Sequence, residues 1–476
     1  MAIIKSTPGQ EVAHIPAGPF KIRLPGLHYR FEIMDFILAL FLCCCCLSAM
    51  PMISAANPHL PHDVVWDMVI VMGLLYLLQV LLGDPVVPGW VTPSIALTTV
   101  YLTQFEEGAA RMQALCAVQL LVAVIYLFMG ATGLARKLVG IVPNALKAGI
   151  LLGAAISAGW GELKDGGRFG QYPIAAALCT ALALFLLFSN TYQELRKKSK
   201  ILDFIGRFGM VPSFLICVLV APLVGECAWP DFSTLSLTNL IRIPDFGQLA
   251  SYCSPFALGF PTGEMFIKAL PQAIVIYIIG FGDFVTCKAL MKDAQETRND
   301  EKIFFNPNRS NLICGIRNLL CALICPNICM CGPLGAPLAI AILNRYKDGK
   351  KAMESVWSGM GTFRIGTAFA VAFVPIVVAL NPILPPAVSV SMFVQAFSMS
   401  RVAVDQAKDK MDFCIMGVMG TFLAVKGAKW ALIAGIIMYF VVCDKKKILA
   451  DFRGSMAEVK ADQEAEAAEE RAQTAA

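Results

Sequence analysis

The chain has 476 residues, of which 57% are hydrophobic and only 15% are charged, and its formal net charge is +5. A soluble protein of this length needs more charged residues to cover its surface, so a soluble domain with one large core is excluded. The small positive charge gives no reason to expect a nucleic-acid partner. The apolar residues come in runs of about 20, the length that crosses a hydrocarbon layer about 30 Å thick. The composition therefore predicts a multi-pass, all-α protein of the inner membrane, with the lipid bilayer as its first partner.

Residues 1–32 are polar and rich in Pro and Gly, so we expect no cleavable signal peptide in them. We expect them to form a cytoplasmic arm. Residues 33–226 then hold the first seven predicted spans, which are 33–55, 64–82, 87–104, 111–130, 138–158, 172–189 and 208–226.

Residues 227–266 are predicted to be an extracytoplasmic connector, because several prolines interrupt them. Residues 267–443 hold a second set of seven spans, which are 267–290, 311–324, 332–344, 357–379, 386–400, 411–425 and 428–443. Residues 444–476 begin with lysines and continue rich in Ala and Glu. We expect this charged cytoplasmic tail to be a solvated helix or disordered.

Lysine and arginine are concentrated in alternate loops, at 136–137, 196–200, 292–309, 345–351, 401–410 and 445–447. Loops 56–63 and 379–386 contain neither residue. Loop 159–171 and the turn near Lys426 run against the pattern. Because cytoplasmic loops carry the excess of Lys and Arg, the alternation predicts that both termini are cytoplasmic. An odd number of spans in each half gives the halves opposite orientations, so we predict two inverted seven-span repeats.

The third span of each set is interrupted by Pro and Gly, at residues 84–94 and at residues 325–337. A helix starts readily at such a point but does not easily pass through it. We therefore predict two half-helices, in spans three and ten, whose N-termini lie at mid-membrane depth. Such N-termini favour an anion or a carbonyl group. Ordinary proline kinks are the alternative.

Asp283 lies inside the apolar run of residues 267–290. A carboxylate there costs about 2.5–3.5 kcal/mol on insertion scales, so we expect it to face the interior of the bundle and to couple transport to an ion. The alternative is that Asp283 lies near the membrane edge and pairs with Lys288. The predicted substrate-binding residues are Thr92, Ser94, Asp283, Thr286, Asn327, Gly332, Leu334 and Gly335. For Asn327, a hydrogen bond between helices without a ligand is the alternative.

The seventeen cysteines do not predict a metal or redox site. Residues 43–46 are four consecutive cysteines, which point in four directions on a helix and cannot share one metal ion. The cysteines of residues 314–331 have no His or carboxylate beside them. We expect small apolar side chains, no metal, no cofactor and no catalytic residue. A membrane-embedded thiol or metal enzyme is the less favoured alternative.

Several segments resemble the superfamily of sulfate permeases and nucleobase–ascorbate transporters. Residues 280–292 are similar to the eighth span of sulfate permeases, residues 306–319 to the entry of the ninth, and residues 138–154 to the fifth. Pro326-Asn327 before Gly332 is similar to uracil permeases. The resemblance implies fourteen spans arranged as core and gate domains, a site between spans three, eight and ten, and elevator-like movement.

The sequence also departs from both families. Pro333 stands where sulfate permeases have a basic residue, and Ile279 and Pro333 stand where uracil permeases have glutamates. The C-terminal regulatory domain of most sulfate permeases is expected to be missing. The sequence therefore predicts a secondary active transporter of a small anion or small polar solute, coupled to H⁺ or Na⁺ through Asp283. A nucleobase permease and a passive anion channel on the same fold are the alternatives, and a homodimer remains open.

Overall fold

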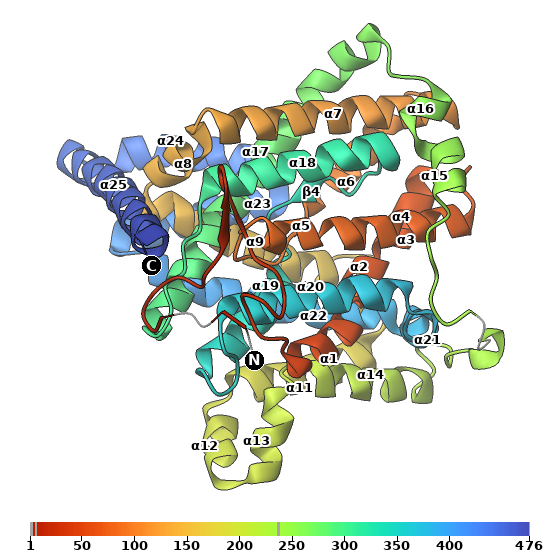
Figure 1. Ribbon diagram of the computed structural model, residues 1–476, viewed down its shortest axis with the longest axis horizontal. Helices are drawn as coiled ribbons and strands as arrows, with labels where there is room; N and C mark the ends of the chain where they lie inside the picture. Colours follow the sequence, from red (N-terminus) through yellow and green to blue (C-terminus); the bar gives the residue numbers. More distant parts are fainter. Residues whose placement is uncertain (1–2, 5–6, 236–238, 476) are drawn as a thin grey trace.

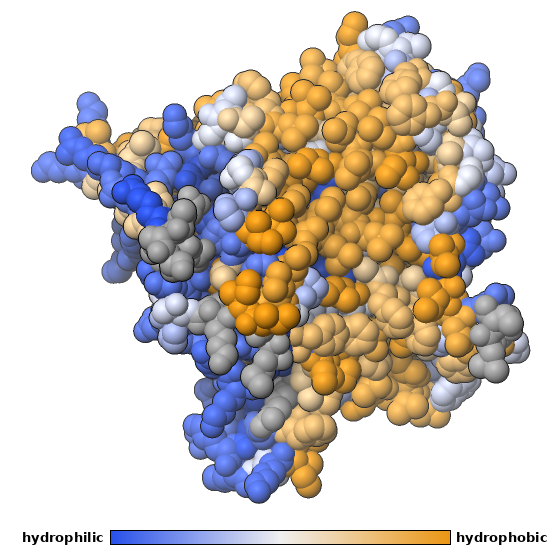
Figure 2. All heavy atoms as spheres, viewed as in Figure 1, coloured by the Kyte–Doolittle hydropathy of each residue, from blue (hydrophilic) through white to orange (hydrophobic). Residues whose placement is uncertain are grey.

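The computed structural model describes residues 3–4, 7–235 and 239–475. Its long helices, among them α4, α7, α18 and α20, lie side by side with their axes roughly aligned across the molecule (Figure 1). The N-terminal segment and the last helix, α25, lie at one end, which we call the tail end. Apolar residues form a broad band across the view, and hydrophilic residues gather at the two ends (Figure 2). This distribution suits a protein that spans a bilayer along the direction of its long helices.

The first part of the chain contains the paired strands β1 and β2, the strand β3, whose partner β4 lies later in the chain, and most of the shorter helices. Its elements are β1 Ile15–Ala17, β2 Phe20–Ile22, α1 Ile33–Leu42, α2 Cys44–Leu47, α3 Ala49–Ala56, α4 His62–Leu75, α5 Leu77–Leu81, β3 Gly89–Trp90, α6 Thr92–Leu102, α7 Ala109–Ala131, α8 Leu134–Ile141, α9 Asn144–Leu163, α10 Arg168–Gln171, α11 Pro173–Phe188, α12 Asn190–Lys198, α13 Lys200–Arg207 and α14 Val211–Leu223.

The connector is not wholly irregular, because it contains a 3-10 turn and two short helices. Its elements are η1 Phe232–Thr234, α15 Phe246–Cys253 and α16 Pro255–Leu258. The last part consists of α17 Gly263–Thr297, α18 Pro307–Ile324, β4 Cys331–Gly332, α19 Ala336–Lys347, α20 Val356–Ala372, α21 Val374–Leu380, η2 Asn381–Ile383, α22 Leu384–Gln406, α23 Lys410–Lys426, α24 Ala428–Val442 and α25 Lys445–Ala475.

Five helices of the described chain are long and apolar enough to cross a membrane, and the number rises to eight if each sharply bent helix pair counts as one span. Each of the fourteen predicted segments contains a helix, but several of these helices are short. The structure is therefore that of a multi-pass helical membrane protein. Fourteen spans in two inverted repeats remain a prediction.

Local sequence signals explain where the helices around the site begin. The Asn306 side chain accepts hydrogen bonds from the backbone N–H groups of Asn308 and Arg309, and Pro307 occupies the first turn of α18. The Thr262 hydroxyl caps α17 in the same way. Such caps satisfy N–H groups that have no partner inside the helix. The starts of α17 and α18 are thus set by short-range sequence.

The long helices form two bundles. In the first bundle, α7 packs against α17 and α18, while α20 packs against α1, α4 and α5. In the second bundle, α9 packs against α22, α23 and α24, and α11 packs against α14 and α22. Helix α17 also contacts α9 and α22, and α19 contacts α22. The two bundles therefore meet along α17 and α19, and also where α2 contacts α22 and α1 contacts α14.

Both ends of the chain are more ordered than the sequence indicates. The N-terminal arm forms an antiparallel hairpin in which Ile15 pairs with Ile22. The tail is one long helix, α25, and its residues Ser455, Val459 and Glu466 are buried. The expectation of a solvated or disordered tail missed these contacts, because they join residues hundreds of positions apart.

Candidate binding site between the two broken spans

Strand β3 pairs antiparallel with β4, so that Gly89 lies opposite Gly332 and Trp90 opposite Cys331. On either side of this pair the Val91 N–H donates to the Met330 carbonyl over 2.9 Å, and the Gly335 N–H donates to the Val87 carbonyl over 2.7 Å. Helices α6 and α19 begin directly afterwards, each with a proline in its first turn. The two extended segments and the two helix starts form what we call the crossing.

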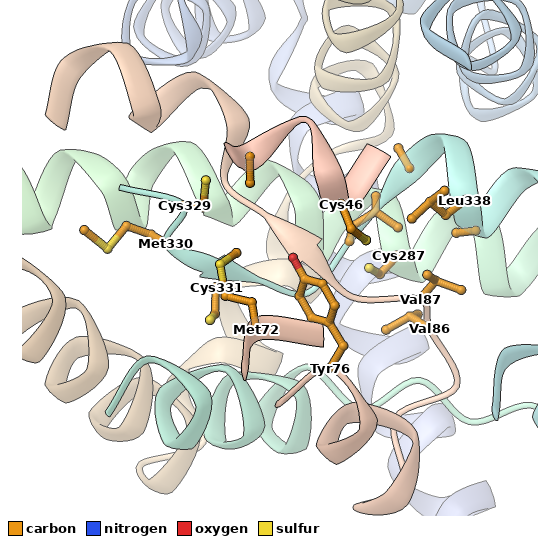
Figure 3. Packing of buried hydrophobic residues seen from close by; sticks show 14 of the residues in the cluster. Cys46, Met72, Tyr76, Val86, Val87, Cys287, Cys329, Met330, Cys331 and Leu338 are labelled. Carbon is orange, nitrogen blue, oxygen red and sulfur yellow. The ribbon is translucent and has the colours of Figure 1, made fainter. Parts of the chain in front are cut away.

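The crossing brings the two backbones into very close approach. A Cβ atom on Gly89 would lie 2.5 Å from the Leu334 carbonyl oxygen and 2.8 Å from the Gly335 Cα. Real Cβ atoms do not come so close to backbone atoms, so position 89 requires glycine. Figure 3 shows the apolar side chains that fill the space around the crossing, among them Met72, Tyr76, Val87 and Cys331.

Two fully buried arginines hold the carbonyl groups of the crossing. Arg317 Nη1 on α18 donates to the Gly332 carbonyl over 3.1 Å, and Arg364 Nη2 on α20 donates to the Pro88 carbonyl. Their guanidinium groups lie 4.8 Å and 4.5 Å from the centre of the Tyr76 ring. Two nitrogens of each guanidinium have no hydrogen-bond partner among the described residues. The arginines therefore retain donor capacity beside the two helix starts.

One carboxylate, Asp84, lies near these arginines and is separated from Arg317 by the Gln79 side chain. Gln79 accepts a hydrogen bond from Arg317 over 3.1 Å and donates one to Asp84. Asp84 is buried, and one of its carboxylate oxygens has no partner among the described residues. Among the ion pairs of the described chain, none involves Arg317 or Arg364. Because cations without close counter-charges attract anions strongly in a buried setting, the crossing is an electropositive centre.

Asp283 lies where α17 passes between the two bundles. A Cβ on Gly280, one turn earlier, would lie 2.5 Å from the Tyr126 hydroxyl and 3.4 Å from a methyl of Val91. A Cβ on Gly282 would lie 3.1 Å from a methyl of Ile150 on α9. Helix α17 is thus closely packed against the α6 start and α7 on one side and against α9 on the other. Asp283 lies at this junction.

The Asp283 carboxylate is half-buried and forms no ion pair or hydrogen bond with another described residue. The alternative pairing with Lys288 is absent, because Lys288 Nζ lies 3.0 Å from Asp462 and 3.7 Å from Glu458 of the tail helix. The Tyr126 hydroxyl is also buried without a partner among the described residues. Two polar groups near the α6 start are therefore able to serve a ligand or a coupled ion.

The other predicted site residues differ in exposure and in whether their side chains already form hydrogen bonds within the protein. Thr92 is exposed at the start of α6, whereas the Ser94 hydroxyl donates to the Val91 carbonyl over 2.7 Å. The Thr286 hydroxyl donates to the Gly282 carbonyl over 2.9 Å. Leu334 is buried within the crossing. The structure brings the 92–94 and 332–335 segments together.

Asn327 lies in the loop before β4, and its hydrogen-bonding groups already have partners within the protein. Its N–H donates to the Gln119 side chain over 3.1 Å, its amide nitrogen donates to the Cys325 carbonyl, and its side-chain oxygen accepts from the Cys329 N–H over 2.9 Å. These bonds favour the alternative that Asn327 supports the loop without touching a ligand.

Sequence reasoning missed Arg317, Arg364 and Gln79. A usable signal was present, since both arginines lie inside predicted spans, where an ionisable residue is a functional candidate by default.

The cysteines around the crossing are buried. The Cys321 and Cys331 sulfur atoms lie 3.8 Å apart. In the part of the chain that the structure describes, no three His, Cys, Asp or Glu residues are grouped as a metal site would need.

A cavity of about 40 Å³ opens between the bundles at the C-terminal end of α19. Its lining includes Asn344 and Lys347 of α19 and Arg401 and Asp405 of α22. A volume of this size holds a few water molecules. The bundle interface is therefore open enough to admit water at the tail end.

No protein-family model matches the chain, and no curated protein matches its sequence. Among solved structures, it is similar to the transmembrane domain of the bicarbonate transporter BicA of a cyanobacterium, with 13% identity over 89% of this chain and 96% of that chain and a TM-score of 0.44. It is also similar to the murine anion transporter Slc26a9 in its inward-facing state, with 13% identity over 87% of this chain and 68% of that chain and a TM-score of 0.45. A further SLC26A9 structure has 16% identity, covers 86% of this chain and 65% of that chain, and gives a TM-score of 0.42.

Proposed function

We propose that the protein is a secondary active transporter of a small anion, which binds at the crossing and is carried by movement of the first bundle against the second. The observation that supports this most is the pairing of β3 with β4, which places the starts of α6 and α19 together. Broken helices that meet inside a membrane protein are a recurring way to build a substrate site.

The electrostatics of the crossing favour an anion over a neutral solute. The starts of α6 and α19 carry the positive ends of two helix dipoles. Arg317 and Arg364 add two buried positive charges behind them. The exposed Thr92 hydroxyl supplies a donor on the ligand side. An anion at this place would be held by backbone dipoles, guanidinium charge and one hydroxyl, without needing an unpaired lysine.

The position of Asp283 supports a coupling role. Its carboxylate lies on α17 between the α6 start and α9, so a proton or Na⁺ bound there would change the charge at the interface of the bundles. A carboxylate without a protein partner at such a depth is costly unless it is protonated, solvated or bound to a cation. We infer that H⁺ or Na⁺ fills this need during the transport cycle.

Transport assays with Asp283 variants in proteoliposomes test this function. Asp283→Asn keeps the side-chain size but removes the charge, so we expect gradient-driven accumulation of the substrate anion to be lost while exchange partly survives. Asp283→Ala should impair both, because it also removes a hydrogen-bonding group. Asp165→Asn, in an exposed loop, is the matched control. Concentrative uptake at the wild-type level by Asp283→Asn would remove the coupling role.

A passive channel would show a different result in the same vesicles. It would equilibrate the anion but would never concentrate it when an H⁺ or Na⁺ gradient is imposed. Radiolabelled inorganic anions, carboxylates and nucleobases should be screened together, because a nucleobase substrate would contradict the anion assignment. We also propose that both termini are cytoplasmic, which labelling of terminal tags in intact cells tests directly.

A further inference from the structure

Helices α12 and α13 form a hairpin that projects sideways from the second bundle, next to α11 and α14 (Figure 1). Helix α12 packs against α11 and α13. Helix α12 is bent by 64° from α11, and α13 is bent by 82° from α14. Because α14 is aligned with the long helices that would cross the bilayer, α13 lies nearly in the plane of the membrane surface.

Helix α13 has one apolar face. Ile201, Phe204 and Ile205 follow one another at helical spacing and share this face, whereas Asp203 lies on the opposite side. Ile201 is 72% exposed and Phe204 is 55% exposed. On the hairpin, hydrophilic residues lie toward the tail end and apolar residues lie on the side of the apolar band (Figure 2). A short helix with this distribution is suited to the boundary between lipid headgroups and acyl chains.

The hairpin also carries a positive charge. Residues 190–207 contain five Lys or Arg and two carboxylates. Arg196 is directed to the protein, since it lies 3.2 Å from Asp348 in the loop after α19. Three lysines beside the turn between the two helices are exposed instead, namely Lys197, Lys198 and Lys200. The ion pair of Lys197 with Glu194 spans 3.8 Å between two largely exposed side chains, so it binds the lysine weakly.

The charge and the position of the hairpin favour anionic lipid as the partner of this surface. Helices α11 and α14 are parts of predicted membrane spans, so they hold the hairpin where headgroups surround the protein. Each lysine near an anionic membrane surface strengthens binding about fivefold. A second copy of the chain would instead bring the same positive segment against itself, because a two-fold interface pairs one surface with its own copy.

We propose that the α12–α13 hairpin is an interfacial anchor for anionic phospholipid. Ile201 and Phe204 insert below the headgroups, and Lys197, Lys198 and Lys200 bind the headgroup phosphates. The hairpin belongs to the second bundle through α11 and α14. It would therefore hold that bundle at a fixed depth while the first bundle moves. This consequence rests on the proposed function, whereas the contact with lipid does not.

Hydrogen–deuterium exchange of residues 195–208 in the full-length protein tests the anchor without a transport assay. Nanodiscs that each hold one copy are made from phosphatidylcholine alone or from phosphatidylcholine with phosphatidylglycerol. Binding of anionic headgroups opposes local opening of the hairpin, so we expect about tenfold slower exchange in the discs with phosphatidylglycerol. Molar sodium chloride should remove most of the difference, because it screens exposed charges.

Two sets of variants separate charge from apolar insertion. Replacing the three lysines by Gln should abolish the response to phosphatidylglycerol, whereas replacing them by Arg should preserve it. Ile201→Ser combined with Phe204→Ser should raise exchange about tenfold in both lipids, since the apolar contact does not depend on headgroup charge. Ile243→Ser is the matched control, because this side chain in the connector is 80% exposed and lies outside the hairpin. It should leave exchange of residues 195–208 unchanged.

Three results would overturn the anchor. The first is equal exchange of the wild type in the two lipids. The second is a response to phosphatidylglycerol that survives replacement of all three lysines by Gln. The third is slower exchange only in discs that hold two copies, which would assign the surface to a contact between copies. Loss of transport activity alone would leave the lipid contact standing.

Discussion

The protein buries arginine side chains in two regions, and the groups that bind these arginines differ between the two. At the crossing, Arg317 and Arg364 donate to backbone carbonyls and have no described ion pair. At the tail end, Arg136 and Arg309 contact the carboxylate of Glu466. Carbonyl groups fix the position of a guanidinium but do not cancel its charge, whereas carboxylates do both. The crossing is therefore prepared to attract an anion, and the tail end already holds one.

The largest expected effect comes from removing charge at the crossing. Arg317→Gln leaves the Gly332 carbonyl and the Gln79 side-chain oxygen without their buried donor, so we expect about 1–3 kcal/mol of lost stability for each unsatisfied acceptor and at least tenfold weaker anion binding. Thermal unfolding and equilibrium anion binding in detergent measure the two effects.

Arg309→Gln is the companion variant from the tail end. It should loosen α25, because it removes a buried partner of the Glu466 carboxylate, and it should leave anion binding at the crossing unchanged. If both variants weakened anion binding equally, the electropositive centre would not lie at the crossing.

At the tail end we expect a smaller effect, which is a dependence of folding stability on pH through Glu301. Glu301 lies between α17 and α18, where burial raises its pKa to about 8 although the Val356 N–H, Arg298 and Arg23 act to lower it. A group that binds its proton more tightly when folded stabilises the protein below its unfolded pKa, here about 4.5, and this stabilisation is lost as the pH rises through about 8.

We therefore expect wild-type stability to fall by about 2 kcal/mol or more between pH 5 and pH 9, since each pKa unit corresponds to about 1.4 kcal/mol. Glu301→Gln, which is neutral at every pH, should remove most of this difference. Melting temperatures of both proteins across the range provide the test, and parallel curves would show that folding does not raise the pKa of Glu301.

The smallest expected effects come from removing either of two hydroxyl groups at the start of α6, and the two variants should behave differently. Ser94 donates to its own backbone, so Ser94→Ala should cost only about 1 kcal/mol of stability and leave the KM for transport unchanged. Thr92 is exposed, so Thr92→Val should raise the KM about fivefold or more while stability stays the same. The opposite pattern would mean that the ligand approaches α6 from its buried side.

Much of the local architecture follows from the sequence because it depends on short-range signals. Runs of apolar residues predict the long apolar helices, and Asn306-Pro307 is the signal for the start of α18. Proline and glycine at residues 84–94 and 325–337 predict that both spans are interrupted, since proline cannot pass through a helix without losing a hydrogen bond. Glu466, by contrast, looks like one more charge in a solvated tail.

Only the tertiary structure decides which distant residues meet. The β3–β4 pair joins residues more than two hundred positions apart, and nothing in either segment specifies the other. Whether Arg317 and Arg364 face lipid, solvent or the crossing depends on how α18 and α20 rotate about their axes as the bundle packs. The sequence determines that these two arginines lie within membrane spans, where burying their charge is energetically unfavourable. The packing determines that this unfavourable free energy is offset by hydrogen bonds to carbonyl groups of the two interrupted spans.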